Sequence, residues 1–238
     1  MRKLIPILLF SLIGLHARSE TFSVDTTIFS CQVHDAVITA GEDSISCMLD
    51  GELISMDMPE GMLLQGIAAF GDGVIAITKG KHILFWDSPF DKARRIRIDM
   101  KGEFTGIDAG SDICYTISDS SEIISVNRAL TGKVLDFNSE YAEYYGKLRL
   151  IDIAAGPSSV FISAVKEDGR PAVFTSSKGT VWSEREMNYA INGIWYTFEK
   201  VPHSITYEEL SESFVLLCED GTEFHLPACS HCNYLIEK

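Results

Sequence analysis

The cysteines and histidines near the end of the chain are the residues whose types and spacing come closest to known chemistry. The run from His225 to Cys232 holds a Cys-x-x-Cys pair and two histidines. Such a pair often supplies two of the four ligands of a zinc ion, and within a thioredoxin-like βαβ unit it is a redox motif. The sequence has no second Cys-x-x-Cys pair and no βαβ pattern here, so we predict neither a metal site nor a redox centre.

Disulfide bonds are the other chemistry open to the six cysteines, because an even count in an exported protein favours pairing. Cys31 precedes the repeats described below, whereas Cys229 and Cys232 follow them. A bond from Cys31 to Cys229 or Cys232 would join the two ends of the fold and is the pairing that we predict. A local bond between Cys229 and Cys232 is the alternative.

A tyrosine-rich segment, Ser139–Gly146, is the strongest candidate for a binding surface. It joins two repeats, and insertions between repeats commonly emerge on a binding face. Tyrosine offers rigid contact area that is both apolar and polar. The predicted contact residues are Tyr141, Glu143, Tyr144 and Tyr145. The alternative is that these tyrosines pack on the edge of the fold.

The elements that must position these residues come from a pattern that repeats along the chain. In the segment Gly66–Trp86, two runs of alternating apolar residues flank Lys79-Gly80, as in a β-hairpin. A similar segment begins about 40 residues later, at Gly106, and another lies about 30 residues before the segment Gly66–Trp86. A fourth copy begins at Ile151, and a weaker fifth begins at Phe214. In this alignment four residues should share one buried position: Val37, Ile67, Ile107 and Ile153.

Each copy has room for four short strands, and a turn of small polar residues or glycine recurs once per copy. The turns are Asp50-Gly51, Lys79-Gly80, Asp119-Ser120, Asp168-Gly169 and Asp220-Gly221. In the copy from Gly66, the strands are expected near Gly66–Phe70, Val74–Thr78, His82–Trp86 and Arg94–Met100. Three cysteines should lie in the second strands of different copies, too far apart to pair: Cys47, Cys114 and Cys218.

A ring of such sheets packs face to face and leaves only short edges exposed. We therefore predict an all-β fold, a β-propeller of five blades with about four antiparallel strands each. Residues 18–238 would form this single domain. A β-sandwich or meander is the alternative. Only Asn138–Gly146 and Ser183–Asn188 lack strand patterning, so helix is poorly supported.

Two stretches resemble known propeller families. Ile67-Ala68-Ala69, Ala76-Ile77-Thr78 and Leu84-Phe85-Trp86 resemble the repeats of regulator-of-chromosome-condensation propellers. Thr175–Trp182 looks like a degenerate Asp-box, the turn of sialidase-type (BNR) and photosystem-assembly-factor-like propellers, with Ser177 in place of the aspartate and Val181 in place of the threonine. These resemblances imply propeller architecture, whereas a fold does not by itself specify an activity.

The Asp-box resemblance also raises glycoside hydrolysis. That reaction usually needs two carboxylates, or a tyrosine nucleophile in sialidases, and a sialic acid calls for clustered arginines. The arginines outside the Lys92–Arg97 segment are scattered, and no catalytic residues can be assigned. We therefore favour a protein without catalytic activity, and a glycan-binding or glycoside-hydrolysing propeller is the alternative.

The N-terminus resembles a secretory signal peptide. Arg2 and Lys3 precede a short apolar stretch that ends near Ala17, which is too short to span a membrane comfortably. Cleavage after Ala17 would leave 18 basic and 34 acidic residues, a net charge of −16. Such an acidic protein repels nucleic acid and anionic membrane surfaces.

Taken together, these features predict an exported protein, secreted or periplasmic, that binds a protein partner and acts as a scaffold. A glycan is the other ligand class considered. No cofactor motif is recognised, and neither nucleic acid nor insertion into a membrane after signal cleavage is expected.

Overall fold

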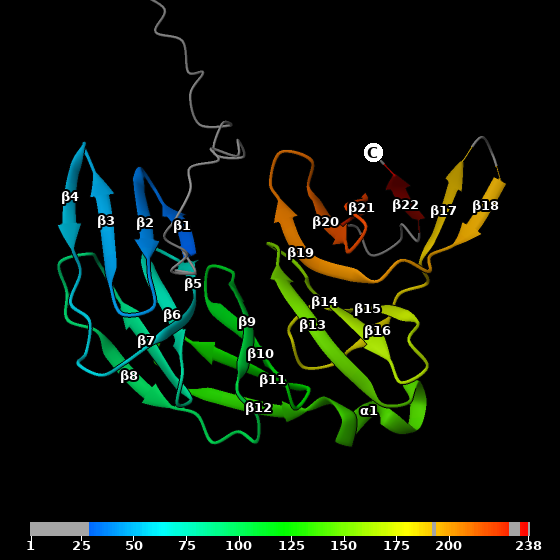
Figure 1. The fold of residues 1–238 in the computed structure, drawn as a ribbon, viewed down its shortest axis with the longest axis horizontal. Helices are drawn as coiled ribbons and strands as arrows, with labels where there is room; N and C mark the ends of the chain where they lie inside the picture. The colour runs from blue at the N-terminus through cyan, green and yellow to red at the C-terminus, as the bar shows by residue number, and fades with distance from the viewer. Residues whose placement is uncertain (1–28, 192–193, 229–233, 238) are drawn as a thin grey trace, which may run out of the picture.

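The fold is a β-propeller of five blades, seen in a computed structural model that describes residues 29–191, 194–228 and 234–237. The blades stand side by side in an arc (Figure 1). The predicted signal peptide, Cys229 and Cys232 lie outside the described residues. No helix in the described ranges is long and apolar enough to cross a membrane.

Blades 1 to 3 are four-stranded antiparallel sheets whose strands are hydrogen-bonded in chain order. Blade 1 consists of β1 (Phe29–Val33), β2 (Ala36–Ala40), β3 (Ile45–Leu49) and β4 (Glu52–Ser55). Blade 2 consists of β5 (Leu64–Phe70), β6 (Gly73–Thr78), β7 (His82–Trp86) and β8 (Arg94–Arg97). Blade 3 consists of β9 (Phe104–Ala109), β10 (Ile113–Ser118), β11 (Glu122–Asn127) and β12 (Gly132–Asp136).

Blade 4 repeats this topology, and blade 5 extends it to a six-stranded sheet. Blade 4 consists of β13 (Leu148–Ala155), β14 (Val160–Lys166), β15 (Pro171–Ser176) and β16 (Ser183–Glu184). Blade 5 consists of β19 (Pro202–Glu208), β20 (Ser213–Cys218), β21 (Glu223–Pro227) and β22 (Tyr234–Glu237), extended by β17 (Asn188–Ile191) and β18 (Ile194–Thr197). β17 joins β22 in parallel, so the hairpin β17–β18 lies at the outer edge of blade 5.

The core of the molecule lies between the blades. Neighbouring blades contact each other through their first strands, β1 with β5, β5 with β9, β9 with β13, and β13 with β19. Four clusters of buried apolar side chains fill the interfaces between successive blades. A strand inside the arc is therefore buried on both faces. In β6, Val74 and Ala76 pack toward blade 1, whereas Ile75 and Ile77 pack toward blade 3.

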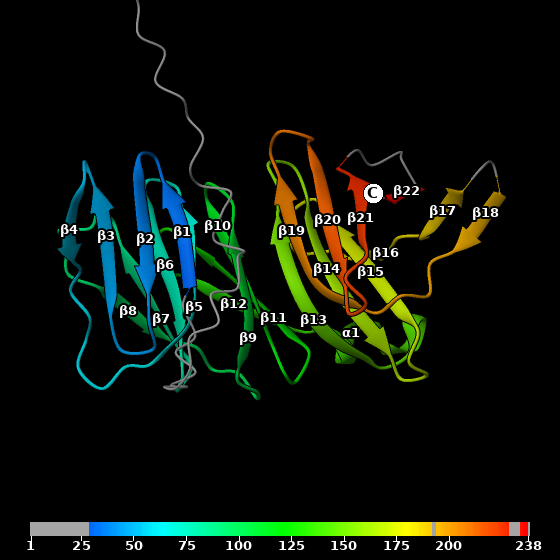
Figure 2. The ribbon, with the colours of Figure 1, turned by 45° about the horizontal axis from the view of Figure 1, so that its top comes forward.

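The arc does not close into a ring through the described residues. None of the four apolar clusters joins blade 5 to blade 1 among these residues. Figures 1 and 2 show blade 1 and blade 5 at the two ends of the arc.

The tyrosine-rich segment forms the helix α1 (Phe137–Tyr145) between blades 3 and 4. Its first turn is capped by the Asp136 carboxylate, which accepts a hydrogen bond from the Ser139 N–H at 3.0 Å. Phe137 is fully buried and packs against blade 4, where its ring lies 5.1 Å from that of Phe174. The helix is thus a connection packed on the blades through aromatic side chains, Phe137, Tyr141 and Tyr145, rather than a free insertion.

The sequence alignment was wrong in blade 1. Val37 lies in β2 and is 45% exposed, whereas the other three residues lie in first strands, where Ile67 and Ile153 are buried and Ile107 is partly buried. Likewise, Cys47 lies in the third strand of its blade, although Cys114 and Cys218 are in second strands as predicted. The Ala-Gly turn that follows the first strand in blades 3 and 4 follows the second strand in blade 1, at Ala40-Gly41, and this shifted the alignment by one strand.

Candidate functional site

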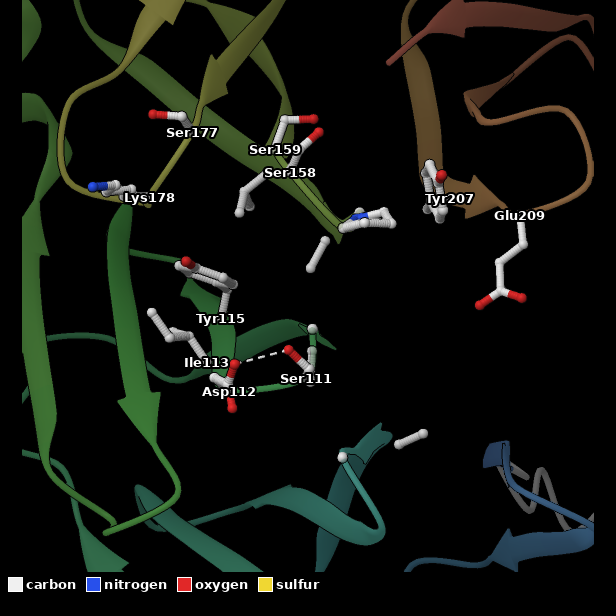
Figure 3. A pocket seen from close by; sticks show the side chains of 18 residues that line it. Ser111, Asp112, Ile113, Tyr115, Ser158, Ser159, Ser177, Lys178, Tyr207 and Glu209 are labelled. Carbon is white, nitrogen blue, oxygen red and sulfur yellow. Dashed lines mark hydrogen bonds between the residues drawn. The ribbon is translucent and has the colours of Figure 1, made fainter. Parts of the chain in front are cut away.

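A cavity of about 710 Å³ lies where the first strands of blades 2 to 5 end. We call it the mouth pocket (Figure 3). Its wall comes from equivalent hairpin loops between first and second strands, with a further contribution from the loop after β15. The residues along it include Ser111, Asp112, Ile113, Tyr115, Ser158, Ser159, Ser177, Lys178, Tyr207 and Glu209.

The loops that form this wall are short turns that expose small side chains and backbone. In blade 3 the Gly110 N–H donates to the carbonyl of Ile113 at 3.0 Å, and in blade 4 the Gly156 N–H donates to that of Ser159 at 2.8 Å. Gly156 also lies against blade 5, because an added Cβ would come within 2.9 Å of the Phe214 ring. Glycine is therefore needed at that position for blades 4 and 5 to approach each other.

The lining combines hydroxyl groups, two tyrosines and both signs of charge. Ser158 and Ser159 project from the loop after β13, and Tyr207 reaches the pocket from blade 5 (Figure 3). Asp112 accepts a hydrogen bond from the Ser111 hydroxyl at 2.9 Å. Lys178 is the cationic side chain of the wall, and Asp112 and Glu209 are its carboxylates. Such a surface can hold polar backbone groups and an amphipathic side chain.

The turn after β15, whose sequence resembles an Asp-box, contributes directly to the pocket. Ser177 and Lys178 line the wall, and the backbone of Gly179 lies in the left-handed region at φ +67°. A Cβ at Gly179 would come within 2.2 Å of the Tyr115 ring, so the turn packs closely on blade 3. In this chain the turn therefore joins blades 3 and 4 at the pocket.

Two buried carboxylates fix the first strands beside the pocket. Asp108 accepts hydrogen bonds from the N–H of Ala109 in its own strand and of Ala155 in blade 4, both at 2.8 Å. Asp152 accepts from Ile153 in its own strand and from Ile205 in blade 5, both at 2.9 Å. Each carboxylate therefore ties its own blade to the next one.

Burial controls the titration of both groups. Desolvation raises the pKa of Asp108 to about 6, and the nearby charge of Asp152 adds to this effect. Burial likewise raises the pKa of Asp152 above its usual range. Because the oxygens of both carboxylates are occupied by backbone N–H groups, the arrangement serves blade packing rather than acid-base chemistry on a ligand.

Arg128 holds the blade 3 side of the pocket. Its Nε donates to the carbonyl of Ser111 at 3.0 Å, and its guanidinium lies 6.0 Å from the centre of the Phe70 ring in blade 2. The side chain thus links the pocket loop of blade 3 to the blade before it. Arg128 is a positioning residue, because it acts on the pocket through Ser111.

The predicted binding residues on α1 lie far from the mouth pocket, at the opposite end of β13. That strand has eight residues, which corresponds to a length of about 26 Å. Tyr141 and Tyr145 pack against the core between blades 3 and 4, and the Tyr141 hydroxyl accepts a hydrogen bond from the Trp182 N–H at 3.1 Å. Glu143 and Tyr144 face solvent, with Tyr144 76% exposed.

The cysteines form no disulfide among the residues that the structure describes. Cys31 packs beside the cluster between blades 1 and 2, and burial raises its pKa to about 12. Its predicted partners, Cys229 and Cys232, lie outside the described residues, so that pairing stays a prediction. Within the described ranges, no group of three or more histidine, cysteine, aspartate or glutamate side chains is arranged to hold a metal ion.

The mouth pocket was not predicted from the sequence. In the sequence, its loops show only an Ala-Gly step in blades 3 and 4, and the turn that resembles an Asp-box was used there only as a sign of propeller architecture. The pocket could have been located from the fold, because equivalent loops of successive blades meet at one end of a propeller. That inference requires the correct strand order in every copy.

Comparison with known proteins supports the fold alone. No family model matches the chain, and no curated protein is similar to it in sequence. Among solved structures, YCF48 from Cyanidioschyzon merolae has a TM-score of 0.63 at 10% identity, over 91% of this chain and 73% of that one. YCF48 bound to D1 peptide has a TM-score of 0.60 at 12% identity, over 89% and 68% of the two chains. The Pan2 WD40 domain of Neurospora crassa has a TM-score of 0.57 at 10% identity, over 87% and 63%. The chain is thus a β-propeller with YCF48-like and WD40-like structural neighbours.

Proposed function

We propose that this protein is an exported propeller without catalytic activity that binds an extended segment of a partner protein in its mouth pocket. The observation that carries the proposal is the cavity itself, formed by equivalent loops of blades 2 to 5. Support also comes from the structure of YCF48 bound to D1 peptide, a neighbour with the same fold.

The lining suits an extended peptide better than a compact charged ligand. Serine hydroxyls and loop backbone can pair with peptide N–H and C=O groups, and the partly exposed Tyr207 offers a face for an apolar side chain. Asp112 and Glu209 outweigh Lys178 in charge. We therefore expect the bound segment to carry a lysine or arginine beside an apolar residue.

Export is proposed from the N-terminal residues alone. The test is N-terminal sequencing of protein recovered from the periplasm or culture medium. A mature protein that begins at Arg18 would support the proposed cleavage. Protein that keeps residues 1–17 and stays in the cytoplasm would contradict it.

Peptide binding can be tested by screening the mature protein against a random peptide library and measuring affinities of the selected peptides. Ser158→Trp should fill the pocket and weaken binding by at least about tenfold, because the new ring occupies the space of the peptide. Ser120→Trp is the matched control, since Ser120 is also exposed but lies in the turn after β10, at the other end of blade 3. Equal losses in the two variants would contradict the proposal.

The alternative ligand class is a glycan, because hydroxyl and aromatic groups also bind sugars. A glycan array probed with the same two variants separates these possibilities. If the peptide screen selects nothing, and a glycan binds the unmodified protein but not Ser158→Trp, the ligand of the mouth pocket is a glycan and not a peptide. Release of a cleaved sugar would show that the protein is an enzyme.

A further inference from the structure

The outer edge of blade 2 carries the densest group of basic residues in the sequence. Its last strand, β8, contains Arg94, Arg95 and Arg97, and Lys92 lies just before it in the loop after β7. Four of the 20 basic residues thus lie within six positions of a chain whose net charge is −14. We call these four residues the basic edge.

The backbone of β8 has an open side. This strand is the last of its sheet, paired only with β7, and it lies at the periphery of the arc (Figure 1). The Ile98 N–H donates to the carbonyl of Lys81 at 2.8 Å. Hydrogen-bonded and non-bonded positions alternate along an antiparallel pair, so Arg95 and Arg97 are non-bonded positions of β8. Their N–H and C=O groups therefore point away from β7, where another strand can pair with them.

The side chains at these two positions are also open to a ligand. Arg95 and Arg97 are two residues apart in a strand and project on the same face. Both are exposed, as is Lys92. Within the described part of the chain, no ion pair joins these three residues to a carboxylate. Arg94 differs, because it is bound to Asp87 at 3.1 Å and so is held by its own blade.

The other carboxylates near the edge do not neutralise it. Asp91 accepts a hydrogen bond from the Ser88 hydroxyl at 2.8 Å, and Asp57 accepts one from the Ala93 N–H at 3.3 Å. Asp99, which follows β8, is exposed and makes no ion pair among the described residues. The charges along the open side of β8 are therefore available to an acidic partner.

The edge strands of the other blades have a different composition. β4 and β16 contain glutamate and no basic residue, β12 contains one lysine and one aspartate, and β18 contains no charged residue. Basic residues on an edge strand repel the same edge of a second copy. They attract an acidic strand instead, so the edge of β8 is selective and not simply blocked.

We propose that β8 binds an acidic segment of a partner protein, which pairs with the open side of the strand and extends blade 2 by one strand. The segment carries aspartate or glutamate at alternate positions, which places its carboxylates beside Arg95 and Arg97 on one face. Backbone hydrogen bonds hold the added strand, and the charges select it. This contact is separate from the mouth pocket, where we expect a basic peptide.

Other occupants fit this edge less well. A second copy that paired β8 with β8 would place arginines beside arginines. A sulfated glycan or a nucleic acid could use the arginine side chains but would leave the open backbone groups of Arg95 and Arg97 unused. The rest of the chain is acidic and repels a long polyanion. A short acidic strand touches only the basic edge.

The first test screens the mature protein against a displayed peptide library with aspartate or glutamate fixed at alternate positions. We expect peptides whose affinity falls at least about tenfold when Arg95→Glu is combined with Arg97→Glu, because like charges then lie on adjacent strands. The matched control combines Arg149→Glu with Arg170→Glu, two exposed arginines of blade 4, and should keep the affinity. A library that yields no binder, or equal losses in the two double variants, would overturn the proposal.

The second test separates strand pairing from attraction between charges alone. Two versions of a selected peptide carry backbone N-methyl groups, one at the acidic positions and the other at the positions between them. The N–H groups of a strand point alternately towards and away from its neighbour. We therefore expect one version to lose affinity at least about tenfold and the other to keep it. The same affinity for both versions would overturn the proposal.

The third test separates this contact from the mouth pocket and from polyanion binding. The acidic peptides should bind Ser158→Trp as tightly as the unmodified chain, and their loss in that variant would place them in the mouth pocket and overturn the proposal. A heparin fragment is the polyanion probe. If the library yields no peptide and heparin binds through Arg95 and Arg97, the edge is a polyanion site and the proposal is wrong.

Discussion

Blades 1 and 4 have the same four-stranded topology but differ in how many of their faces are buried. In β14 of blade 4, Phe161 packs toward blade 5 and Ile162 toward blade 3, and both are fully buried. In β2 of blade 1, Ile38 is buried against blade 2 while Val37 is 45% exposed. The neighbouring blades, rather than the topology, thus determine how much apolar surface a blade buries.

The polar contacts between blades differ in the same way. Blade 4 is tied to its neighbours by Asp108 and Asp152, whose carboxylates accept backbone N–H groups across the interfaces. Blades 1 and 2 are linked by exposed side-chain contacts, the His34–Asp72 hydrogen bond at 3.1 Å and the Lys79–Glu42 ion pair at 3.4 Å, and by the backbone bond from the Leu64 N–H to the Glu42 carbonyl at 2.6 Å. Exposed pairs of this kind stabilise a fold by only about 0 to 1 kcal/mol. Blade 1 is therefore held mainly by one apolar face.

The largest expected effect comes from truncating the apolar contact of blade 4 with blade 5. The rings of Phe161 and Phe214 lie 4.1 Å apart and are fully buried. Phe161→Ala should lower the free energy of unfolding by about 3 to 5 kcal/mol, because it leaves a cavity at the interface. Val37→Ala, on the open face of blade 1, should change it by less than about 0.5 kcal/mol. Urea unfolding of both variants measures this, and a comparable loss from Val37→Ala would show that this face is covered within the chain.

A smaller effect is expected from the titration of Asp108, whose pKa is raised to about 6 by burial. In the unfolded chain this pKa is about 3.9, so the folded protein binds more protons between about pH 4 and 6. The free energy of unfolding should therefore fall as the pH rises through this window, by about 3 kcal/mol at most. Urea unfolding measured from pH 4 to 7 tests this prediction, and the urea concentration at the midpoint should fall as the pH rises.

The matched variants for this test are Asp108→Asn and Asp220→Asn. Asp108→Asn removes the titrating group and should flatten the pH dependence, with Asp152 contributing what remains. Asp220 has its pKa lowered to about 2 by hydrogen bonds from Thr222, so its stabilising effect is lost only as the pH falls below about 4. Asp220→Asn should thus keep the slope between pH 4 and 6. If the stability of Asp108→Asn depends on pH as steeply as that of the unmodified chain, Asp108 is not the source of the pH dependence.

The sequence predicts the architecture well because a strand buried between two blades leaves a strong pattern. The strands of blade 2 begin and end within a few residues of their expected positions, and the turns at Lys79-Gly80 and Asp168-Gly169 lie between second and third strands. The five blades of small antiparallel sheets are confirmed. Alternation does not tell one strand of a hairpin from the next, which is why Val37 was assigned to the wrong strand.

The candidate site was harder to predict because it depends on how the blades are arranged. Ser158 and Lys178 are unremarkable in sequence and become neighbours only where loops of different blades meet. The tyrosines of α1 were predicted to bind a partner because the segment is rich in tyrosine, but Tyr141 and Tyr145 pack on the core. Composition identified an unusual segment, whereas burial and hydrogen bonds assign its residues to packing or to the surface.

The smallest effects separate the packed and the exposed tyrosines of α1. Tyr141→Phe removes the acceptor of the Trp182 N–H, and should lower the free energy of unfolding by about 1 kcal/mol. Tyr144→Phe, at a side chain that is 76% exposed, should leave it within about 0.5 kcal/mol. Because α1 lies at the far end of β13 from the mouth pocket, Glu143→Ala combined with Tyr144→Ala should not change the affinity for the selected peptides. If this double variant loses binding tenfold while Ser158→Trp retains it, the binding face is the helix and the mouth pocket is not the site.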